Sequence, residues 1–318
     1  MSERVLITGA GGFIGWHLTN YLKTRGYWVR GVDIKRPQFA ETAADEFDDR
    51  CDLRRTENAQ AAVLGIDHVY HLAADMGGMG HIAYHDAEIC HNNSLINLNT
   101  LEAARLAGVK RFFFSSSVCV YPDMISTDYA FDEEDAYPAA PDNEYGWEKL
   151  YFERVLQSYA RDYDIETRIA RFDNTYGPYG TWRSGREKAP AALCRKVAEA
   201  VRDNNAYIDV WGDGEQVRPF LYIDDNARAI YRLMQSDYDK PVNFASPFLT
   251  TINELVDTIS EIAGINVKKR HDMTKPQGVR FRNISGELAF AELGWYPEVD
   301  LCDGLVKTYA WIEEQVTK

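Results

Sequence analysis

The sequence predicts an α/β protein in which a parallel β-sheet is doubly wound with helices and is followed by a smaller C-terminal α/β lobe. Three observations predict this fold. In the first half, short apolar segments alternate with helical ones, which is the pattern of βαβ units. A glycine-rich turn directly follows the first apolar segment. The second half is less regular, with Pro178, Pro190 and Pro219 and a glycine-rich loop at 176–185.

The individual elements follow from apolar runs and their period. In the first half we expect strands at residues 4–8, 28–33, 68–72, 111–115 and 167–171. The helices between them are expected at 12–25, 87–107 and 145–163. In the second half we expect helices at 189–203, 224–235 and 252–263 and a short strand at 208–211.

This order of elements predicts two structural units. Residues 1–174 are expected to form the sheet domain, and residues 175–318 mainly the smaller lobe, with 219–246 packing back on the sheet domain. A chain of 318 residues is long enough to bury a core in each unit. We expect the two units to share one cleft, which is a frequent place for a ligand.

The composition argues against several kinds of partner. The net charge of −14 at pH 7 disfavours a general nucleic-acid or anionic-membrane binder, so we expect neither nucleic acid nor membrane as a partner. The first residues enter a strand directly, and no apolar run is long enough to span a bilayer, so we expect no secretory signal.

The cysteines and histidines predict neither a disulfide framework nor a metal site. Without a CxxC motif, the scattered cysteines are expected to be free thiols in a reducing cytoplasm. They are Cys51, Cys90, Cys119, Cys194 and Cys302. The cluster of His81, His85, Cys90 and His91 lacks an established ligand pattern, so we expect no metal.

The turn after the first strand has the spacing of a dinucleotide site. Gly9, Gly12 and Gly15 form GxxGxxG, which permits a tight turn and lets backbone amides approach a pyrophosphate at a helix N-terminus. Phe13 and Ile14 lie between the last two glycines and are expected at the same site. Together with the βαβ order, this turn predicts a Rossmann-type domain.

Asp33 indicates which dinucleotide binds. At the end of the second strand, a carboxylate binds the adenosine ribose hydroxyls and repels a 2′-phosphate, so we expect NAD as the cofactor rather than NADP. Lys35 and Arg36 weaken this preference without reversing it. We expect the adenine and the pyrophosphate to meet Asp52, Leu53, Ala73 and Ala74.

A serine, a tyrosine and a lysine indicate redox chemistry. Tyr145 and Lys149 are four residues apart on a predicted helix, so both side chains leave the same face. A nearby cation lowers the pKa of a phenol, so Tyr145 is expected to act as a general base near neutral pH. With Ser117 after the fourth strand, this set resembles the catalytic set of the extended short-chain dehydrogenase/reductase family over nearly the whole chain. The resemblance implies that Ser117 hydrogen-bonds the reacting oxygen and that Lys149 binds the nicotinamide ribose.

Further motifs narrow the resemblance to the subfamily of GDP-mannose 3,5-epimerases. They lie at residues 73–80, 117–122, 180–182, 185–192, 211–214, 278–283 and 293–295. The resemblance implies NAD-dependent epimerisation of GDP-mannose at C3 and C5, to GDP-L-galactose and GDP-L-gulose, through transient oxidation of C4. A ketone at C4 acidifies the protons on C3 and C5, and inversion then needs a base on one face and an acid on the other. Cys119 and Lys188 are the implied pair, since a thiol and an amine are both tunable toward neutrality.

The resemblance also implies how the GDP-sugar is held and how the protein assembles. The implied substrate-binding residues are Gly77, Ser117, Val118, Cys119, Asn174, Glu187, Lys188, Ala189, Lys196, Gln216, Val217, Arg218 and Arg282. Members of the family are homodimers, commonly joined through a helix bundle that here would use residues 87–107 and 145–163.

Two other functions stay open from the sequence. One is a nucleotide-sugar 4-epimerase or 4,6-dehydratase of the same fold. Dehydratases usually place Asp-Glu just after the catalytic serine or threonine, where this chain has Val118-Cys119, and a simple 4-epimerase leaves Cys119 and Lys188 unexplained. The other is an NAD-binding sensor or scaffold without turnover, a class that commonly lacks the tyrosine or the lysine.

Overall fold

A seven-stranded parallel sheet forms the larger part of the computed structural model, which describes residues 3–82, 84–126 and 128–318. The strand order is β10-β6-β5-β4-β1-β2-β3, and every neighbouring pair is parallel. The strands are β1 (Arg4–Thr8), β2 (Trp28–Val32), β3 (Glu46–Asp48), β4 (His68–His71), β5 (Arg111–Ser117), β6 (Glu166–Phe172) and β10 (Pro241–Phe244). The order reverses between β1 and β4, the position at which doubly wound sheets bind ligands.

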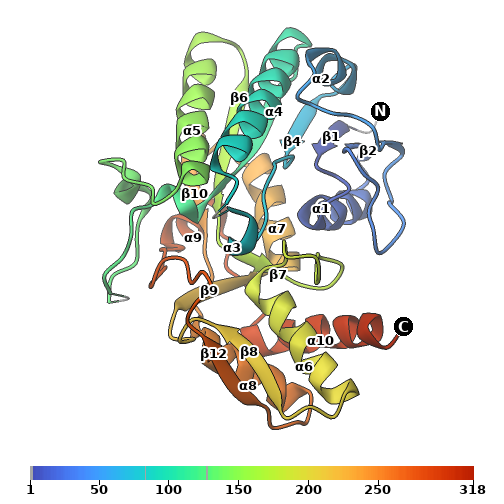
Figure 1. The fold of residues 1–318 in the computed structure, drawn as a ribbon. Coiled ribbons are helices and arrows are strands. Elements are labelled where there is room, and N and C mark those ends of the chain that lie inside the picture. The colour runs from blue at the N-terminus through green and yellow to red at the C-terminus, as the bar shows by residue number, and fades with distance from the viewer. Residues whose placement is uncertain (1–2, 83, 127) are drawn as a thin grey trace.

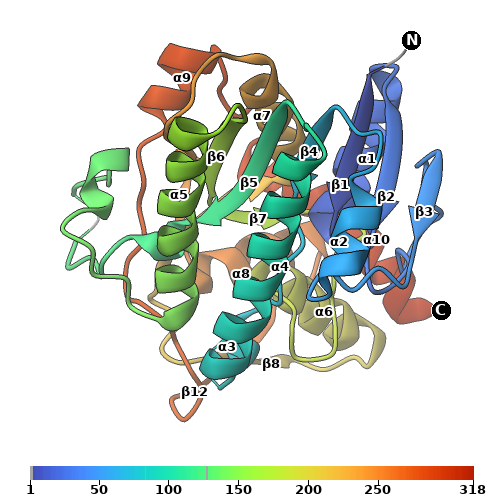
Figure 2. The same cartoon turned by 90° about the horizontal axis from the view of Figure 1, so that it is seen from above.

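Helices cover both faces of this sheet (Figure 2). The helices α2 (Thr56–Ala62), α4 (Asp86–Leu106) and α5 (Glu144–Asp162) pack on one face, and α1 (Phe13–Thr24), α7 (Ile223–Gln235) and α9 (Glu287–Leu293) pack on the other. Because side chains alternate along a strand, Val5 and Ile7 enter the core under α1, whereas Leu6 enters the core under α4. A strand that is buried on both faces must be apolar throughout, which explains the Val5–Ile7 run.

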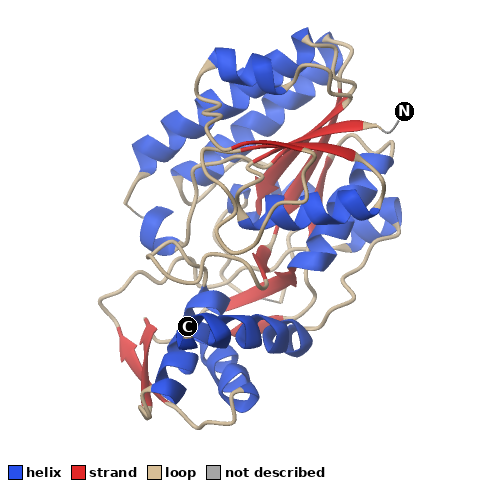
Figure 3. Ribbon diagram, turned by 90° about the vertical axis from the view of Figure 1, so that its right-hand side faces the viewer, coloured by secondary structure: helices blue, strands red, loops and turns tan. Residues whose placement is uncertain are grey.

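The smaller lobe lies below the sheet domain in Figure 1 and contains two small sheets and three long helices. One sheet joins β11 (Leu249–Thr251), β9 (Val217–Tyr222) and β7 (Asn174–Tyr176), and the other joins β8 (Tyr207–Trp211) to β12 (Lys268–Asp272). The helices α6 (Ala189–Arg202), α8 (Ile252–Ile262) and α10 (Leu301–Thr317) enclose the core of this lobe. Figure 3 shows α10 carrying the C-terminus beside the lower helices. Three short helices, α3 (Met79–Ile82), η1 (Val118–Val120) and η2 (Glu133–Ala136), belong to loops.

The chain passes between the two lobes more than once. After β9 it returns to the sheet domain, where α7 packs against α1 and β10 pairs with β6. It returns again at α9, where Trp295 is buried in the sheet-domain core and its indole donates a hydrogen bond to the Asp225 carbonyl. The division of the chain at residue 174 stays a prediction. Because of these crossings, residues after 174 contribute to both lobes.

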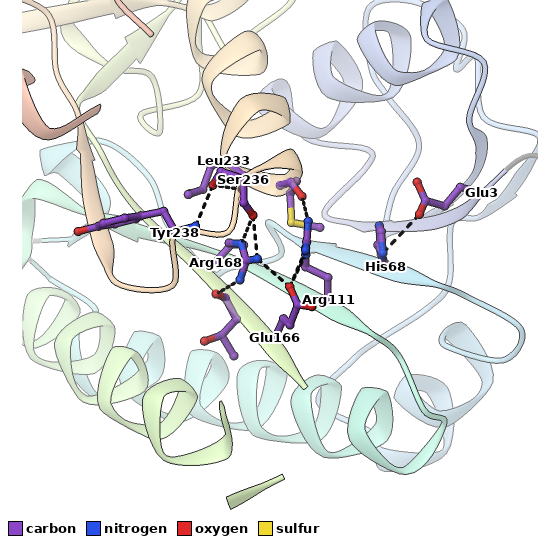
Figure 4. Close-up of polar contacts among 10 residues, drawn as sticks. Glu3, His68, Arg111, Glu166, Arg168, Leu233, Ser236 and Tyr238 are labelled. Carbon is purple, nitrogen blue, oxygen red and sulfur yellow. Dashed lines mark hydrogen bonds and ion pairs between the residues drawn. The ribbon is translucent and has the colours of Figure 1, made fainter. Parts of the chain in front are cut away.

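A network around the buried Arg168 fastens the C-terminal end of α7 to the first residues of β5 and β6 (Figure 4). Arg111 begins β5 and pairs with Glu166, which begins β6, at 2.5 Å. Arg168 pairs with the same carboxylate at 2.7 Å and donates to the Ser236 carbonyl just after α7. Cations stabilise the carboxyl end of a helix, so this network anchors α7 through its dipole as well as through hydrogen bonds.

Every element that the sequence predicts is present, with its ends shifted by at most two residues. The sequence does not predict the short β3, nor β9, β10, β12, α2, α9 and α10. None of the helices in the described part of the chain combines the length and the apolar character that a bilayer crossing requires.

Candidate active site

The glycine turn between β1 and α1 is too tight for side chains. Gly9 has a φ of +70°, and a Cβ on it would lie 2.9 Å from the Ala73 amide nitrogen. A Cβ on Gly15 would lie 2.2 Å from the Gly9 carbonyl oxygen, so α1 can approach β1 only with glycine there. Gly12 is the N-cap of α1, and no acidic residue lies in its first turn. The amides at this helix end are therefore directed at a site suited to an anion.

Asp33 closes the rim of this turn. Its carboxylate accepts hydrogen bonds from the backbone amides of Gly11 at 3.0 Å and Ile34 at 2.7 Å. Burial raises the pKa of Asp33, while the amides and Lys35 act in the opposite direction. The three amides that meet this carboxylate, including that of Lys35 at 3.2 Å, fix its orientation toward the glycine turn.

The other residues predicted for the dinucleotide divide into two groups. Ala73 lies directly at the turn, where its amide donates to the Thr8 hydroxyl at 3.1 Å, and Ala74 follows it in the half-buried loop. Asp52 pairs with Arg54 at 2.8 Å at the rim. The Leu53 side chain is buried in the sheet-domain core, so only its backbone could contact a ligand. Phe13 and Ile14 begin α1; Phe13 packs against the core of the smaller lobe, and Ile14 packs against both cores.

Ser117, Tyr145 and Lys149 meet where β5 ends against the first turns of α5. The Ser117 hydroxyl is close enough to the Tyr145 phenol to lower its pKa against the effect of burial. The Lys149 ammonium lies 5.5 Å from the centre of the Tyr145 ring and donates to the Ser115 carbonyl at 3.0 Å. The structure thus brings together the three residues predicted for redox chemistry.

Burial dominates the electrostatics of this group. It raises the pKa of Tyr145, with Cys119 and Glu148 acting in the same direction and Ser117 opposing them. Burial also lowers the pKa of Lys149, although nearby acidic groups oppose this shift. The expected net lowering of the Tyr145 pKa is therefore wrong for this structure, in which burial raises it. The spacing of the two residues predicts their shared face, but it contains no information about how deeply the phenol is buried.

Cys119 lies beside the tyrosine, in the short helix η1. Its backbone amide donates to the Ser117 hydroxyl at 3.2 Å. A Cβ on Gly146 would lie 2.0 Å from the Cys119 carbonyl oxygen, so the first turn of α5 rests directly on this residue. The half-buried thiol packs with Met76 and Tyr145 in a small cluster between α4 and α5. Gly146 is thus needed to bring Cys119 and Tyr145 into one site.

Lys188 reaches the same site from the smaller lobe, where it is the N-cap of α6. The segment before it is bound to the glycine loop of the sheet domain, because the Gly78 amide donates to the Arg186 carbonyl at 3.0 Å. A Cβ on Gly78 would lie 2.4 Å from the Glu187 carbonyl oxygen, so the two segments touch. Burial lowers the pKa of Lys188, and the charges of Cys119 and Asp173 oppose this shift. The Cys119 and Lys188 side chains are thus close enough to interact, although they come from different lobes.

Two arginines lie around the same centre. Arg282 is buried and donates to the carbonyls of Tyr121 at 3.3 Å and Pro122 at 3.2 Å, directly after η1. Burial and the charge of Arg282 lower the pKa of Arg218 to about 10, against the acidic groups around it. Two neighbouring guanidinium groups, that of Arg282 buried and that of Arg218 half-buried, suit an anion, and the protein carries them despite its negative net charge.

The remaining residues predicted for the substrate lie around these two arginines and along the contact between the lobes, where Gly78 meets Arg186 and Glu187. Gln216 is buried, and its amide oxygen has no hydrogen-bond partner among the described residues. Lys196 is already hydrogen-bonded to the Asp209 carbonyl at 2.6 Å, and the Val118 side chain is buried in an apolar cluster. The others are Gly77 beside His81, Asn174 in β7, Glu187 and Ala189 on either side of Lys188, and Val217 at the start of β9.

Asp173 lies near the same site and was not predicted from the sequence. This residue follows β6, is buried, and acts electrostatically on Lys188. The signal was present, because a carboxylate directly after a predicted strand lies at the edge where parallel sheets bind ligands.

Comparison with known proteins shows which family the chain belongs to. The model of the NAD dependent epimerase/dehydratase family matches residues 5–245, well over half of the chain. The chain belongs to this family. GDP-mannose 3,5-epimerase 1 of Oryza sativa subsp. japonica is 44% identical over 99% of this chain and 83% of its own length. GDP-mannose 3,5-epimerase of Arabidopsis thaliana is 43% identical over the same shares. GDP-L-fucose synthase of Escherichia coli (strain K12) is 29% identical over 98% of this chain and 97% of its own length.

Solved structures of epimerases share the fold. UDP-glucose 4-epimerase from Thermotoga maritima, crystallised with UDP-glucose, superposes with a TM-score of 0.87 at 26% identity, over 98% of this chain and 99% of that one. UDP-glucose 4-epimerase of Thermus thermophilus, in complex with NAD, superposes with a TM-score of 0.83 at 25% identity, over 97% of this chain and 98% of that one. These likenesses confirm the doubly wound parallel fold.

As a member of the NAD dependent epimerase/dehydratase family, the protein is an enzyme whose cofactor is NAD. The residues present fit this cofactor. Gly9 and Gly15 leave space that a side chain at either position would fill. The backbone amides at the start of α1 suit a pyrophosphate. The Asp33 carboxylate can accept hydrogen bonds from the hydroxyls of the adenosine ribose.

Proposed function

We propose that the protein epimerises GDP-mannose at C3 and C5 of the hexose, to GDP-L-galactose and GDP-L-gulose, by temporary oxidation of C4. One observation carries the proposal: Lys188, from the smaller lobe, lies within the electrostatic field of Cys119, which packs against Tyr145 and donates its amide to Ser117. The identity of 44% to a GDP-mannose 3,5-epimerase over nearly the whole chain supports the same reaction.

In the redox part, Tyr145 removes the proton of the C4 hydroxyl and later returns it. Ser117 hydrogen-bonds the same oxygen, because its hydroxyl lies beside the phenol at the end of β5. When bound, NAD supplies the hydride acceptor at C4, returns the hydride at the end, and brings a cationic ring that favours ionisation of a nearby phenol. The buried Lys149 binds the nicotinamide ribose and contributes a fixed positive charge to the site.

In the inverting part, Cys119 and Lys188 act from opposite faces of the sugar ring. The C4 ketone acidifies the C–H bonds at C3 and C5, since the carbanion is delocalised as an enolate. One member of the pair removes a proton as thiolate or amine, and the other protonates the carbon from the opposite face. A negative charge on Cys119 favours the ammonium form of Lys188, because it acts against the burial that lowers the pKa of that lysine.

Three cationic side chains and one amide hold the GDP moiety. Arg218 and Arg282 meet the diphosphate, with Lys196 at its outer side, and the Gln216 amide oxygen accepts a hydrogen bond from the nucleoside. The remaining sugar contacts come from residues at the lobe contact and beside Cys119. They are Gly77, Val118, Asn174, Glu187, Ala189 and Val217.

The structure also favours Cys/Lys inversion over the two other reactions. A 4,6-dehydratase needs an acidic pair at Val118 and Cys119, and Val118 is buried in an apolar cluster. A simple 4-epimerase gives Lys188 no task at the tyrosine site. A sensor or scaffold without turnover has no need for Cys119 and Lys188 to meet there.

We also propose a cytoplasmic homodimer. Trp147 and Tyr151 on α5 and Leu95 and Leu98 on α4 are exposed apolar side chains on the two helices expected at a dimer contact. The cysteines are free thiols, which fits a reducing compartment. Sedimentation equilibrium of the purified chain tests the dimer, and a single monomeric species would contradict it.

The function is tested by incubating the protein, supplied with NAD, with a panel of GDP- and UDP-sugars and analysing the products by NMR. We expect GDP-mannose to yield sugars inverted at C5 and at both C3 and C5. A product inverted only at C4, or a 4-keto-6-deoxy sugar from any member of the panel, would support the alternatives instead.

A further inference from the structure

The loop at residues 177–182, part of the glycine-rich segment after β7, has no task in the proposed reaction. It lies between α1 and α10 (Figure 1). Its backbone rests on the first turns of α1, where Nε2 of His17 donates a hydrogen bond to the Pro178 carbonyl at 3.0 Å. A Cβ on Gly180 would lie 3.2 Å from the Phe13 ring. The loop is therefore held against the helix that begins at the glycine turn.

The same loop forms one wall of the space in front of the glycine turn. A single cavity is lined by Gly11 and Gly12 of the turn, by the segment at 35–40 after β2, and by Tyr179 and Thr181 of the loop. The amides at the start of α1, which suit a pyrophosphate, lie at this turn. A dinucleotide that binds there is therefore bounded by the 177–182 loop.

Tyr179, in the middle of the loop, has a backbone conformation that tyrosine rarely adopts. Its φ is +63°, in the left-handed region where a side chain crowds the backbone. Such strain persists only where the surrounding structure fixes it, and it is concentrated at ligand sites and switch segments.

Two tryptophans from different elements fix Tyr179 in this conformation. The centre of its ring lies 4.7 Å from that of Trp16 in α1 and 5.4 Å from that of Trp311 in α10. Trp311 in turn contacts the Phe39 ring, from the segment after β2, at 5.1 Å. Aromatic pairs at these distances attract each other beyond the area that they bury, which offsets the backbone strain. Tyr179 thus joins the loop to both lobes at once.

We infer that Tyr179 is a positioning residue for the cofactor: its stacking between Trp16 and Trp311 holds the 177–182 loop over the glycine turn and slows the exchange of NAD. These contacts all lie within the chain, so they hold the loop without help from a ligand. The loop must therefore open both for entry and for release of the dinucleotide. The inference rests on the NAD cofactor of the family and holds whether or not GDP-mannose is the substrate.

Stopped-flow measurement of NADH fluorescence tests the inference, with release followed by displacement with excess NAD. Tyr179→Gly removes the ring, and glycine adopts a positive φ without strain, so the loop keeps its backbone path. We expect both association and release to become about tenfold faster or more, the size expected for the loss of two aromatic contacts. Because both rates rise together, the dissociation constant should change less than either rate.

Two controls separate stacking from other effects of substitution. Tyr179→Phe keeps the ring and removes only the hydroxyl, which has no hydrogen-bond partner in the part of the chain that the structure describes, so it should keep the wild-type rates. Tyr207→Ala removes an exposed tyrosine in β8, away from the glycine turn, and should also leave both rates unchanged.

A further variant keeps the test decisive. If Tyr179→Gly does not fold, Trp311→Leu removes a stacking partner that does not line the cavity, and it should accelerate both rates in the same way. Release that becomes faster without faster association would indicate a merely structural role and would overturn the inference. Rates equal to those of the wild type in a folded Tyr179→Gly protein would overturn it as well.

Discussion

Arg171 and Glu153 form an ion pair at 2.7 Å in which each side chain is 2% exposed, directly beneath the active-site segment after β5. Glu153 accepts a hydrogen bond from the Ser116 hydroxyl at 2.5 Å, and Arg171 donates to the Tyr121 hydroxyl at 3.0 Å. The pair therefore holds both ends of the segment that contains Ser117 and Cys119. It holds in place the segment to which Ser117 and Cys119 belong.

Breaking this pair should cost stability. In Glu153→Gln, a buried arginine is left without its counter-charge, so we expect the free energy of unfolding to fall by about 3–5 kcal/mol. Urea denaturation followed by circular dichroism measures this loss. Glu102→Gln is the control, because its partner Arg105 is at the surface and such pairs contribute about 1 kcal/mol or less. Equal effects of the two substitutions would contradict the role given to the buried pair.

Removing the phenol of Tyr145 should stop both halves of the reaction. In Tyr145→Phe, no group takes the proton of the C4 hydroxyl, so we expect turnover to fall by about 100-fold or more. Deuterium exchange at C3 and C5 should fall equally, because those protons are acidic only beside a C4 ketone. Dinucleotide binding, measured by calorimetry, should persist. Exchange at C5 with wild-type rate in this variant would show that C4 oxidation is not required.

Cys119→Ser and Lys188→Ala should separate inversion from redox chemistry. We expect each to reduce inversion at C3 and C5 by about 100-fold or more, since each removes one member of the acid/base pair, while NAD stays bound. The rates come from NMR of the product, and binding comes from calorimetry. Cys302→Ser, at an exposed thiol far along the chain in α10, is the control and should keep wild-type activity. Wild-type inversion by Lys188→Ala would remove the lysine from the mechanism.

His71 should make the fold sensitive to acid. Burial lowers the pKa of His71 to about 3, and its ring is hydrogen-bonded to the Thr8 hydroxyl at 2.9 Å and to the Asn97 amide oxygen at 2.8 Å. The unfolded chain takes up this proton near pH 6.5 and the folded chain does not. The contribution to stability is thus complete above about pH 6.5 and is lost as the pH falls toward 3, by up to about 1.4 kcal/mol per pH unit.

The comparison with His71→Gln isolates this effect, since glutamine does not titrate. Unfolding free energies from urea titrations at pH 7.5, 6 and 5 should fall more steeply with acid for the wild type than for the variant. Parallel pH dependences would mean that the unfolded chain and the folded chain protonate this ring alike.

The elements that the sequence predicted are those in which local pattern and tertiary packing agree. The apolar run of β1, the glycine turn and the long helices α4 and α5 are of this kind. The strand β12 (Lys268–Asp272) consists of polar residues, and its strand conformation comes from pairing with β8, which no local pattern contains. In α10, Gly304 argues against a helix. The structure shows why it is there, because a Cβ at that position would lie 2.0 Å from the Tyr176 hydroxyl oxygen.

The site was predictable only in its parts. Ser117, Tyr145 and Lys149 are joined by one strand and one helix, so their meeting follows from the spacing. The approach of Lys188 to Cys119 depends on the contact of Gly78 with Arg186 across the two lobes, which resemblance implied but spacing does not contain. The direction of the Tyr145 pKa shift was wrong because burial is a property of the whole fold.

The central claim is that C4 is oxidised only so that C3 and C5 can be inverted. The most direct test is incubation of the protein with NAD and GDP-mannose in D2O, followed by NMR of the recovered sugar. The account predicts deuterium at C5 and C3 of the epimerised sugars and none at C4, since the hydride returns without mixing with solvent. It also predicts loss of this deuterium in Cys119→Ser. An epimerised sugar that carries deuterium at neither C3 nor C5 would contradict the claim, and so would the absence of any product.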